Sequence, residues 1–497
     1  MKRKQSKHPP PLVQPPGARE LASAYQLLLS EQEYAQLLLE LDQPLLSAIR
    51  LNPLKAPPDL TLRLKNKYGW LLEPISFCPQ GYKVKVGDGI EVSAALEHRL
   101  GLYYIQEAAS MLPAELFNFH PGREELVLDM AASPGGKTTH ILSRLRDHGL
   151  VLANDSSQGR IQALRIVLQQ WGAVNTAITR FPGERFGEWY PEMFDKVLLD
   201  APCSMQGLRT ADSHTSRPVT DKESLQLSRR QLALLTSAVR ALRVGGEVVY
   251  STCTLLPRED ELVVDALMRE FNGTIEILNA QAILPAPAPA LASLEGAALH
   301  PDLIRAIRLW PHRYHTAGFF VCHLRKNERT QAPTSPPPSR PMDQAGFQPM
   351  TARDQRAFCA EFEDTYGFDL GVDLEQYRRT MVRRYEEIHL FPALLLDEFP
   401  DLPLQSAGIL LGQDTPDGFL PSHQWISRYG IQCTHNRVQL DELETAQWAS
   451  GADLSSRGSP VKSPQAYRVV SNPEGLVLGC GKVTNTALKN LLPRRLL

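Results

Sequence analysis

The stretch Leu126-Val-Leu-Asp-Met-Ala-Ala-Ser-Pro-Gly-Gly-Lys-Thr-Thr139 decides the fold of this chain. Its apolar beginning, Leu126 to Leu128, predicts a buried strand, and Lys137 to His148 has the apolar spacing of a helix. A strand, a glycine turn and a helix in succession are typical of a nucleotide site at the carboxyl end of a parallel sheet. Gly135 and Gly136 let a ligand approach the backbone closely, and the helix N-terminus offers unpaired N–H groups.

Two classes of ligand fit a turn of this kind. A P-loop for nucleoside triphosphates needs a glycine at position 131, and the chain has Ala131 there. An adenosyl ligand needs an acid at the end of the next strand, about 20 residues further on, to hold the ribose hydroxyls. Asp155 ends the apolar run that begins at Leu150. The stretch therefore favours a site for S-adenosyl-methionine, and an ordinary strand-to-helix turn is the alternative.

Composition and charge limit the classes of protein to consider. A chain of 497 residues is too long to fold around a single hydrophobic core, so we expect roughly two to four domains. Lys and Arg number 53 against 55 Asp and Glu, so nucleic-acid binding would have to come from local basic patches. The seven cysteines form no C-x-x-C pair, which argues against a zinc ribbon or a redox dithiol. No apolar run predicts a membrane span or a signal peptide, so we expect a cytoplasmic protein.

Predicted strands and helices alternate around the glycine turn, which indicates a doubly wound, mostly parallel, Rossmann-like α/β sheet. Basic residues flank this region on both sides. Basic and apolar residues alternate in two stretches, Ser47 to Lys55 and Leu62 to Lys67. This alternation predicts half-buried strands, whose outer face either contacts RNA phosphates or is an ordinary charged surface. The stretch from Leu374 to Tyr385 is predicted to be a helix that contains Arg378, Arg379, Arg383 and Arg384. These arginines would form either a phosphate-binding patch or a solvent-exposed face.

Two strands of the predicted sheet each end in a cysteine, in Asp200-Ala-Pro-Cys203 and in Ser251-Thr-Cys253. Ligands bind at the carboxyl edge of such a sheet. A thiolate that adds to C6 of cytosine makes C5 nucleophilic enough to take a methyl group from a sulfonium, and a carboxyl group near N3 and N4 stabilises the charge that builds up. Either cysteine alone reads as an inert buried thiol. The pair, with Asp200 and the glycine turn, predicts catalysis. Gln106, Glu107 and Ser110 are candidates for the floor of the pocket.

These motifs, in this order and spacing, resemble the NOL/NOP/Sun RNA cytosine-C5 methyltransferases, and the long tail is similar to that of the bacterial ribosomal RNA subfamily RsmF. Tyr104-Ile-Gln-Glu-Ala-Ala-Ser110 and the segment from Trp310 to Phe320 also match. The resemblance implies that Cys253 attacks C6, that Cys203 assists product release, and that Asp200 lies between cofactor and base. The cofactor site that it implies consists of Ala131, Ala132, Ser133, Pro134, Gly135, Gly136, Lys137, Asp155 and Asp200.

Two positions depart from the family pattern. Pro182 stands where the family often has an acid that helps to hold adenosine, which puts cofactor affinity in doubt unless Glu184 substitutes. Ser204-Met205-Gln206-Gly207 replaces the usual Ser-Gly-Glu-Gly, which bears on the choice of target. The leading hypothesis is an S-adenosyl-L-methionine-dependent RNA cytosine-C5 methyltransferase acting on 16S ribosomal RNA or the small ribosomal subunit. The alternatives are a transfer RNA cytosine-C5 methyltransferase and a non-catalytic RNA-binding assembly factor.

The expected organisation follows from these readings. We expect a monomer without a metal and without membrane contact. The C-terminal region is predicted to be a small β-rich, PUA-like module, because it has short β segments, a glycine turn and a basic end. The predicted divisions are a disordered basic tail (1–17), an N-terminal α+β RNA-binding extension (18–98), the methyltransferase catalytic domain (99–326), a linker (327–346), an α-rich segment (347–415) and the PUA-like RNA-binding module (416–497).

Overall fold

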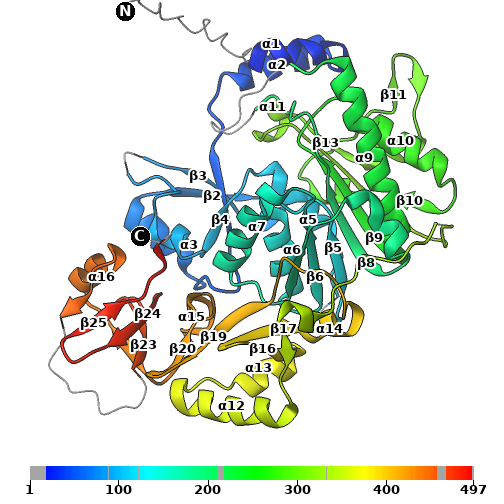
Figure 1. The fold of residues 1–497 in the computed structure, drawn as a ribbon. Coiled ribbons are helices and arrows are strands. Elements are labelled where there is room, and N and C mark those ends of the chain that lie inside the picture. Colours follow the sequence, from blue (N-terminus) through cyan, green and yellow to red (C-terminus); the bar gives the residue numbers. More distant parts are fainter. Residues whose placement is uncertain are drawn as a thin grey trace, which may run out of the picture.

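A computed structural model of the chain describes residues 18–87, 89–120, 122–209, 218–331, 333–455 and 466–494 (Figure 1). The basic tail expected at residues 1–17 lies outside these ranges. Within them, no helix has both the length and the apolar character that crossing a bilayer requires. The described chain forms a large central sheet with helices on both faces, a small N-terminal sheet, and two further sheets in the C-terminal third.

The central sheet has the strand order β10-β14-β9-β8-β5-β6-β7-β18. Its five middle strands are parallel: β9 (Leu242–Thr252), β8 (Phe194–Asp200), β5 (Leu126–Asp129), β6 (Leu150–Asn154) and β7 (Thr176–Thr179). Three antiparallel strands complete the order: β10 (Ile275–Ile277), β14 (Phe319–Lys326) and β18 (Ser406–Ala407). The chain reverses its direction of travel across the sheet between β5 and β8, which opens a crevice at the carboxyl ends of those strands. The predicted doubly wound, mostly parallel fold is confirmed.

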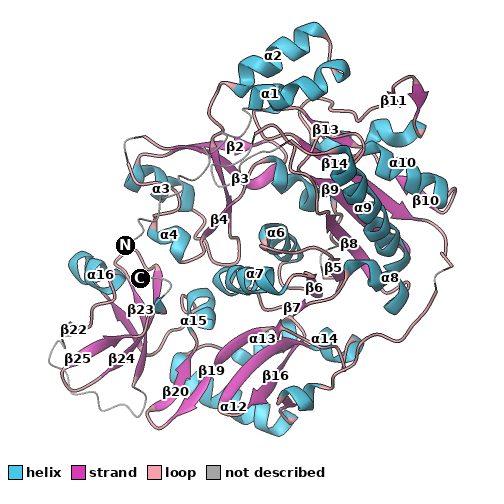
Figure 2. Cartoon of the chain, turned by 45° about the horizontal axis from the view of Figure 1, so that its top comes forward, coloured by secondary structure: helices cyan, strands magenta, loops and turns pink. Residues whose placement is uncertain are grey.

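Helices cover both faces of the central sheet because successive strand residues point to opposite sides (Figure 2). Leu126 and Leu128 of β5 belong to the core on one face, whereas Val127 belongs to the core on the other. The first core is closed by α8 (Phe186–Trp189), α9 (Asp221–Ala241) and α10 (Glu261–Glu270). The second is closed by α5 (Leu112–Leu116), α6 (Gly136–Leu145) and α7 (Gln158–Trp171). Both faces of β5 are therefore buried, and its end is held rigidly.

The N-terminal extension is α+β, as expected. It consists of α1 (Ala18–Ala22), η1 (Ser23–Leu28), α2 (Glu31–Leu41), β1 (Ser47–Leu51), α3 (Leu60–Tyr68), β2 (Leu71–Ile75), β3 (Cys78–Lys85), α4 (Leu96–Arg99) and β4 (Tyr103–Ile105). Its sheet has the order β2-β3-β1-β4. The strand expected at Leu62 to Lys67 is wrong, because these residues form α3. The RNA-facing surface expected for β1 is wrong at Arg50, whose side chain is fully buried.

The C-terminal third contains two five-stranded sheets. The middle sheet, in the order β15-β16-β17-β19-β20, is formed by β15 (Gln348–Pro349), β16 (Arg379–Arg384), β17 (Glu387–Pro392), β19 (Ile409–Thr415) and β20 (Gly418–Pro421). It packs with α12 (Ala352–Tyr366), α13 (Leu370–Gln376), α14 (Ala393–Glu398) and α15 (His423–Tyr429). The segment expected to be α-rich is thus mixed. The β-rich terminal module is confirmed, with β21 (Arg437–Gln439), α16 (Glu442–Ala449), β22 (Leu454–Ser455), β23 (Tyr467–Ser471), β24 (Val477–Val483) and β25 (Ala487–Asn490).

The arginine helix expected at residues 374–385 is wrong, because the helix α13 ends at Gln376 and the arginines lie around β16. Arg379 is buried against Asp373, at 2.7 Å. Arg383 pairs with Asp414 at 2.8 Å, and Arg378 pairs with Glu124. Three of the four guanidiniums are therefore neutralised within the protein. Arg384 alone among them has no carboxylate partner in the described part of the chain.

The parts of the chain are joined by shared cores. Trp70 of the extension and Trp448 of α16 lie in one buried cluster, so the N-terminal sheet packs against the terminal module. The short strand β18 extends the central sheet, because Ser406 pairs with Ile178 of β7. The C-terminal third is therefore packed into the rest of the protein at these two places, and Phe399 also lies in the core of the central sheet, so it is not a tethered appendage.

Candidate active site

A cavity of about 390 Å³ opens at the carboxyl ends of β5, β8 and β9. One wall is the turn after β5, and another is the segment that follows β4. The predicted floor residues Gln106, Glu107 and Ser110 line it. Its other lining residues include Tyr104, Asp129, Ala131, Ala132, Ser133, Pro134, Gly136, Lys137, Asp200, Met205, Arg209, Cys253 and Phe319. Most of the residues expected to bind a cofactor therefore face one space.

The turn between β5 and α6 requires both of its glycines. Gly135 has a φ of 113°, which side-chain-bearing residues rarely adopt. A Cβ on Gly136 would lie 2.8 Å from Cε1 of Tyr104. The buried Arg50 braces the turn from β1, because its Nη2 donates to the carbonyl of Gly136 at 3.0 Å and to Oγ1 of Thr139 at 2.7 Å. The N-terminal extension thus fixes the beginning of α6.

Lys137 and Asp200 form an ion pair on the wall of the cavity. Nζ of Lys137 donates to Oδ2 of Asp200 at 2.7 Å and to Oγ of Ser110 at 2.9 Å. The hydroxyl of Ser251 donates to the other oxygen of Asp200 at 2.8 Å. Burial alone would lower the pKa of Lys137, but the charge of Asp200 outweighs it and the pKa is raised. The carboxylate is therefore held in one orientation beside the cavity.

The two predicted cysteines meet at this edge of the sheet. Cys203 follows β8 and Cys253 follows the neighbouring strand β9, and their Sγ atoms lie 3.2 Å apart. Cys253 lines the cavity, whereas Cys203 lies beside it, outside the lining. The hydrogen bond with Cys253, together with burial, raises the pKa of Cys203, which stays a neutral thiol at pH 7. The two thiols therefore differ in position: Cys253 faces the cavity, and Cys203 lies beside it.

Two aspartates near the glycine turn have different surroundings. Asp129 is buried at the end of β5, and burial raises its pKa to about 7. One of its oxygens accepts from Thr138 at 2.7 Å, and the other has no partner in the described part of the chain. Asp155 is also buried, and its carboxylate accepts the N–H of Ser157 at 2.9 Å while Arg160 lies 3.5 Å away. Asp155 does not line the cavity, so its contact with a ribose stays a prediction.

Comparison with known proteins agrees with this geometry. Residues 116–325 match the family model for 16S rRNA methyltransferase RsmB/F, and residues 19–108 match that for the N-terminal domain of 16S rRNA methyltransferase RsmF. A ribosomal RNA small subunit methyltransferase F of Pectobacterium atrosepticum is 33% identical over 91% of this chain and 90% of its own length. The chain belongs to the RsmB/F family of 16S rRNA methyltransferases. The resemblance to RsmF is thereby confirmed, and so is the Rossmann-like methyltransferase fold.

Further RsmB/F relatives and solved structures extend the comparison. A ribosomal RNA small subunit methyltransferase F of Shewanella woodyi is 33% identical over 91% of this chain and 91% of its own length. The structure of a methyltransferase homologue from Pyrococcus horikoshii has 31% identity and a TM-score of 0.51, and covers 62% of this chain and 99% of that one. NSun6 from the same organism, solved with SFG, has a TM-score of 0.53 over 62% of this chain at 22% identity, which supports the fold alone.

The loop that departs from the family pattern is held by the N-terminal helices. Met205 has a φ of 56° and lines the cavity, whereas the carbonyl of Gln206 accepts from the hydroxyl of Tyr25 at 2.7 Å. Arg209 reaches back to Glu40 at 2.6 Å. Sequence reasoning missed Tyr25 and Arg209, because partners more than 160 positions apart leave no local signal. Of the two substituted positions, Met205 lines the cavity and Gln206 does not.

The suggested replacement of the missing acid is not supported by the contacts of Glu184. Its carboxylate accepts from Nε of Arg230 at 3.0 Å and does not line the cavity. Glu107, by contrast, lies in the floor and accepts the backbone N–H groups of Ala317 at 2.9 Å and of Ser110 at 3.2 Å. Burial raises the pKa of Glu107. Its role is to join two loops that form opposite sides of the cavity.

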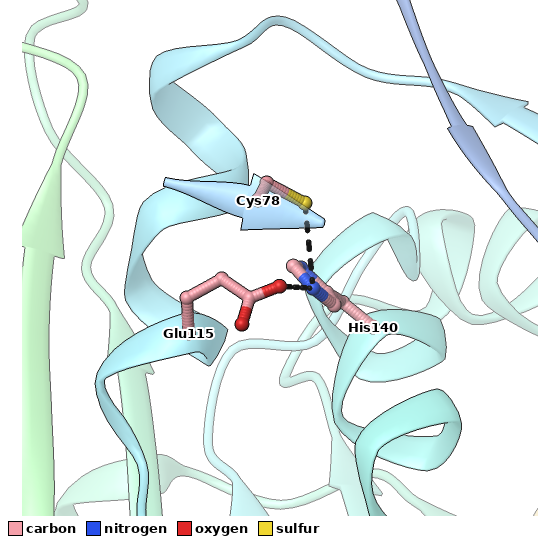
Figure 3. Close-up of side chains that lie close together, drawn as sticks. All are labelled: Cys78, Glu115 and His140. Carbon is pink, nitrogen blue, oxygen red and sulfur yellow. Dashed lines mark hydrogen bonds and ion pairs between the residues drawn. The ribbon is translucent and has the colours of Figure 1, made fainter. Parts of the chain in front are cut away.

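A second group of side chains of metal-binding types, Cys78, Glu115 and His140, lies where β3, α5 and α6 meet (Figure 3). Nε2 of His140 lies 2.8 Å from a carboxylate oxygen of Glu115 and 3.9 Å from Sγ of Cys78. Arg144 binds the other oxygen of Glu115. Burial and the nearby charge of Arg50 lower the pKa of His140 to about 4. Two guanidiniums already supply positive charge to this cluster, which serves to join α5, α6 and β3.

Proposed function

We propose that this methyltransferase carries the methyl group of S-adenosyl-methionine to C5 of a cytosine in ribosomal RNA of the small subunit. The observation that carries the proposal is the 3.2 Å separation of the sulfurs of Cys203 and Cys253, beside Asp200 and at the mouth of the glycine-turn cavity. The names of the relatives, ribosomal RNA small subunit methyltransferase F, support the choice of RNA. Cytosine is favoured because two thiols and one carboxylate meet the chemical needs of C5 addition.

The cavity suits the methyl donor on three grounds. Its volume of about 390 Å³ lies within the usual range of small-molecule sites. The turn at Gly135 and Gly136 leaves the backbone N–H groups at the start of α6 accessible. The buried oxygen of Asp129 that has no partner among the described residues can accept a hydrogen bond from the ammonium group of the donor. When bound, S-adenosyl-methionine supplies an electrophilic methyl group on a sulfonium.

The residues around the cavity would act in sequence on the base. The thiolate of Cys253 would form a bond to C6, and the electron pair of the C5–C6 double bond would move to C5. C5 would then bond to the methyl carbon while the bond from that carbon to the sulfonium sulfur breaks, which would leave S-adenosyl-homocysteine. Asp200, held by Lys137 and Ser251, would accept a hydrogen bond from the N4 amino group and so orient the ring. Loss of the C5 proton restores the double bond and expels the sulfur of Cys253. Cys203 lies close enough to give its proton to the departing sulfur and to take up the C5 proton in exchange.

A trapping experiment separates the roles of the two thiols. With RNA and the methyl donor, Cys203→Ala should accumulate a covalent protein–RNA adduct on a denaturing gel, because release fails after addition. Cys253→Ala should form no adduct and no product. Cys359→Ala, which removes a thiol from α12 on the C-terminal side of the linker, serves as the control and should behave as the unaltered protein. Turnover by Cys253→Ala would refute the assignment of the nucleophile.

A second candidate function is a non-catalytic RNA-binding assembly factor, which Pro182 and the Met205–Gln206 departure favour. Calorimetry with S-adenosyl-methionine decides between the two, since an assembly factor would give no binding. The RNA class is decided by bisulfite sequencing of total RNA from cells that lack the protein. Loss of 5-methylcytosine from 16S ribosomal RNA is expected, and loss from transfer RNA would indicate the other substrate.

A further inference from the structure

A second cavity, of about 360 Å³, lies at the opposite edge of the central sheet from β9. It shares no lining residue with the active-site cavity. Its walls come from three parts of the chain that are distant in sequence: α7 of the catalytic domain, residues 340–347, and the middle sheet at β16 and β17 (Figure 1). The strand β18, paired to β7, forms its floor. The cavity therefore exists only because the C-terminal third packs onto the catalytic sheet.

Three guanidinium groups line this cavity: Arg165 from α7, Arg340 from the segment before β15, and Arg384 from the end of β16. No Asp or Glu is among its lining residues. None of the three arginines forms an ion pair with a carboxylate in the described ranges of the chain. Three positive side chains with no acid beside them give the cavity a positive potential, which suits an anion.

The unused hydrogen-bond donors of the three arginines point to the same conclusion. Nη2 of Arg165 donates to the carbonyl of Gln405 at 2.8 Å, and its Nη1 makes only a long contact, 3.5 Å, with Oε1 of Gln162 among the described residues. Within the described ranges, the side chain of Arg340 makes only a long contact, 3.4 Å, with the carbonyl of Gln344. The guanidinium of Arg384 lies 5.1 Å from the ring centroid of Phe347 and makes no described hydrogen bond. Each arginine keeps donors available for a ligand.

The cavity also offers aromatic surface and a neutral imidazole. Phe347 lines it beside Arg384, and its ring packs against His389 at a centroid distance of 5.3 Å. Burial lowers the pKa of His389, so the imidazole is uncharged at pH 7. The positive charge of the cavity thus comes from the arginines alone. Guanidiniums match the geometry of phosphate oxygens, and an aromatic ring provides a face for a nucleobase.

We propose that this arginine cavity binds a phosphate group together with its nucleoside, and that the RNA substrate supplies it. A volume of about 360 Å³ is within the range of sites for small ligands and admits one nucleotide unit. The site would hold the RNA at a second point, away from the reacting base, and would link the C-terminal third to substrate binding. A free nucleotide offers the same chemistry and is the other source to be distinguished. The site does not depend on the proposed methyl-transfer chemistry.

Adjacent arginines on β16 provide a matched pair of variants. Arg384→Gln removes a guanidinium from the cavity, whereas Arg383→Gln removes one that pairs with Asp414 and does not line it. Arg340→Gln tests a second wall. Arg340 and Arg384 are both exposed, so their substitution should leave the fold intact. Binding is measured by fluorescence anisotropy with a labelled single-stranded oligoribonucleotide at several salt concentrations, and by competition with unlabelled AMP.

Arg384→Gln and Arg340→Gln should each weaken RNA binding about tenfold, since each removes a charge-assisted contact. Each should also make the plot of log association constant against log salt concentration less steep by about 0.7, the value for one phosphate contact on a single strand. Arg383→Gln should change neither quantity. AMP should compete with RNA in the unaltered protein and lose this ability in the cavity variants. Unchanged RNA binding with lost AMP binding would overturn RNA as the source. Equal behaviour of Arg384→Gln and Arg383→Gln would overturn the site.

Discussion

Replacing Arg50 with lysine tests how the N-terminal extension supports the glycine turn. The guanidinium of Arg50 donates to Gln106 at 3.1 Å, to the carbonyl of Gly136 at 3.0 Å and to Thr139 at 2.7 Å. It also stacks on Trp171, 4.7 Å from the ring centroid. A lysine ammonium reaches at most one of these acceptors and cannot stack as a plane. The loss of two hydrogen bonds to a charged group, at about 1.5 kcal/mol each, amounts to roughly 3 kcal/mol.

The effect should be local to the start of α6, so native-state hydrogen exchange is the suitable assay. The opening free energy of the α6 amides should fall by roughly 3 kcal/mol, which is about a hundredfold faster exchange. Arg63→Lys is the control, because Arg63 forms an exposed pair with Asp59 four residues before it and should change stability by less than about 0.5 kcal/mol. If Arg50→Lys leaves α6 exchange as slow as in the unaltered protein, the bracing role assigned to Arg50 is refuted.

Three further predictions concern the cavity. The pKa of Asp129 in the folded protein, about 7, exceeds its value in the unfolded chain, about 3.9. The free energy of unfolding should therefore fall as pH rises from about 4 to about 7. Urea titrations of Asp129→Asn should not show this fall. Gly136→Ala, with its methyl group 2.8 Å from Tyr104, should weaken methyl-donor binding about tenfold in calorimetry, because the ring of Tyr104, which lines the cavity, must shift. Tyr25→Phe, which removes the hydroxyl that donates to the carbonyl of Gln206, should lower turnover about fivefold and leave donor affinity unchanged.

Each of these predictions has an outcome that contradicts it. A pH profile of unfolding that is the same with and without Asp129 would show that its carboxyl group does not carry the proton. Gly159→Ala is the control for the glycine turn, because a Cβ there meets nothing within 4 Å and the residue lies in α7. Equal effects of Gly159→Ala and Gly136→Ala would contradict the steric argument. Reduced donor affinity in Tyr25→Phe would mean that the loop after Cys203 shapes the cofactor site as well.

The sequence was sufficient for the centre of the site because its signals are local. Gly135, Gly136 and the ends of β5, β8 and β9 are set by short apolar runs that stop at turn residues or cysteines. Parallel strands bring their carboxyl ends to one edge, so the meeting of Cys203 and Cys253 followed from topology. The same reasoning found the floor residues after β4. What it could not supply was which groups would hold Asp200, since Lys137 and Ser251 reach it across the sheet.

The errors concern basic residues whose partners are distant in sequence. Arg50 alternates with apolar residues and was expected on a strand surface, facing either RNA or solvent, but it is buried and donates to Gln106, Gly136 and Thr139. The arginines around β16 have spacings that suit a helix. The strand forms instead because residues 379–384 pair along their whole length with β17. In this arrangement Arg379 forms an ion pair with the buried carboxylate of Asp373. Charge patterns alone do not distinguish a solvated face from a buried network, because both depend on partners elsewhere in the chain.

The pairing of β18 with β7 has a consequence for dissecting this protein. Ser406 and Ala407 occupy the hydrogen-bonding edge that β7 would otherwise present to solvent. Open strand edges recruit other strands and promote aggregation. A fragment truncated at residue 326 would expose this edge together with the apolar surfaces that face the missing sheets. Its failure to stay soluble would be a property of the cut and would say nothing about whether the remaining residues suffice for chemistry.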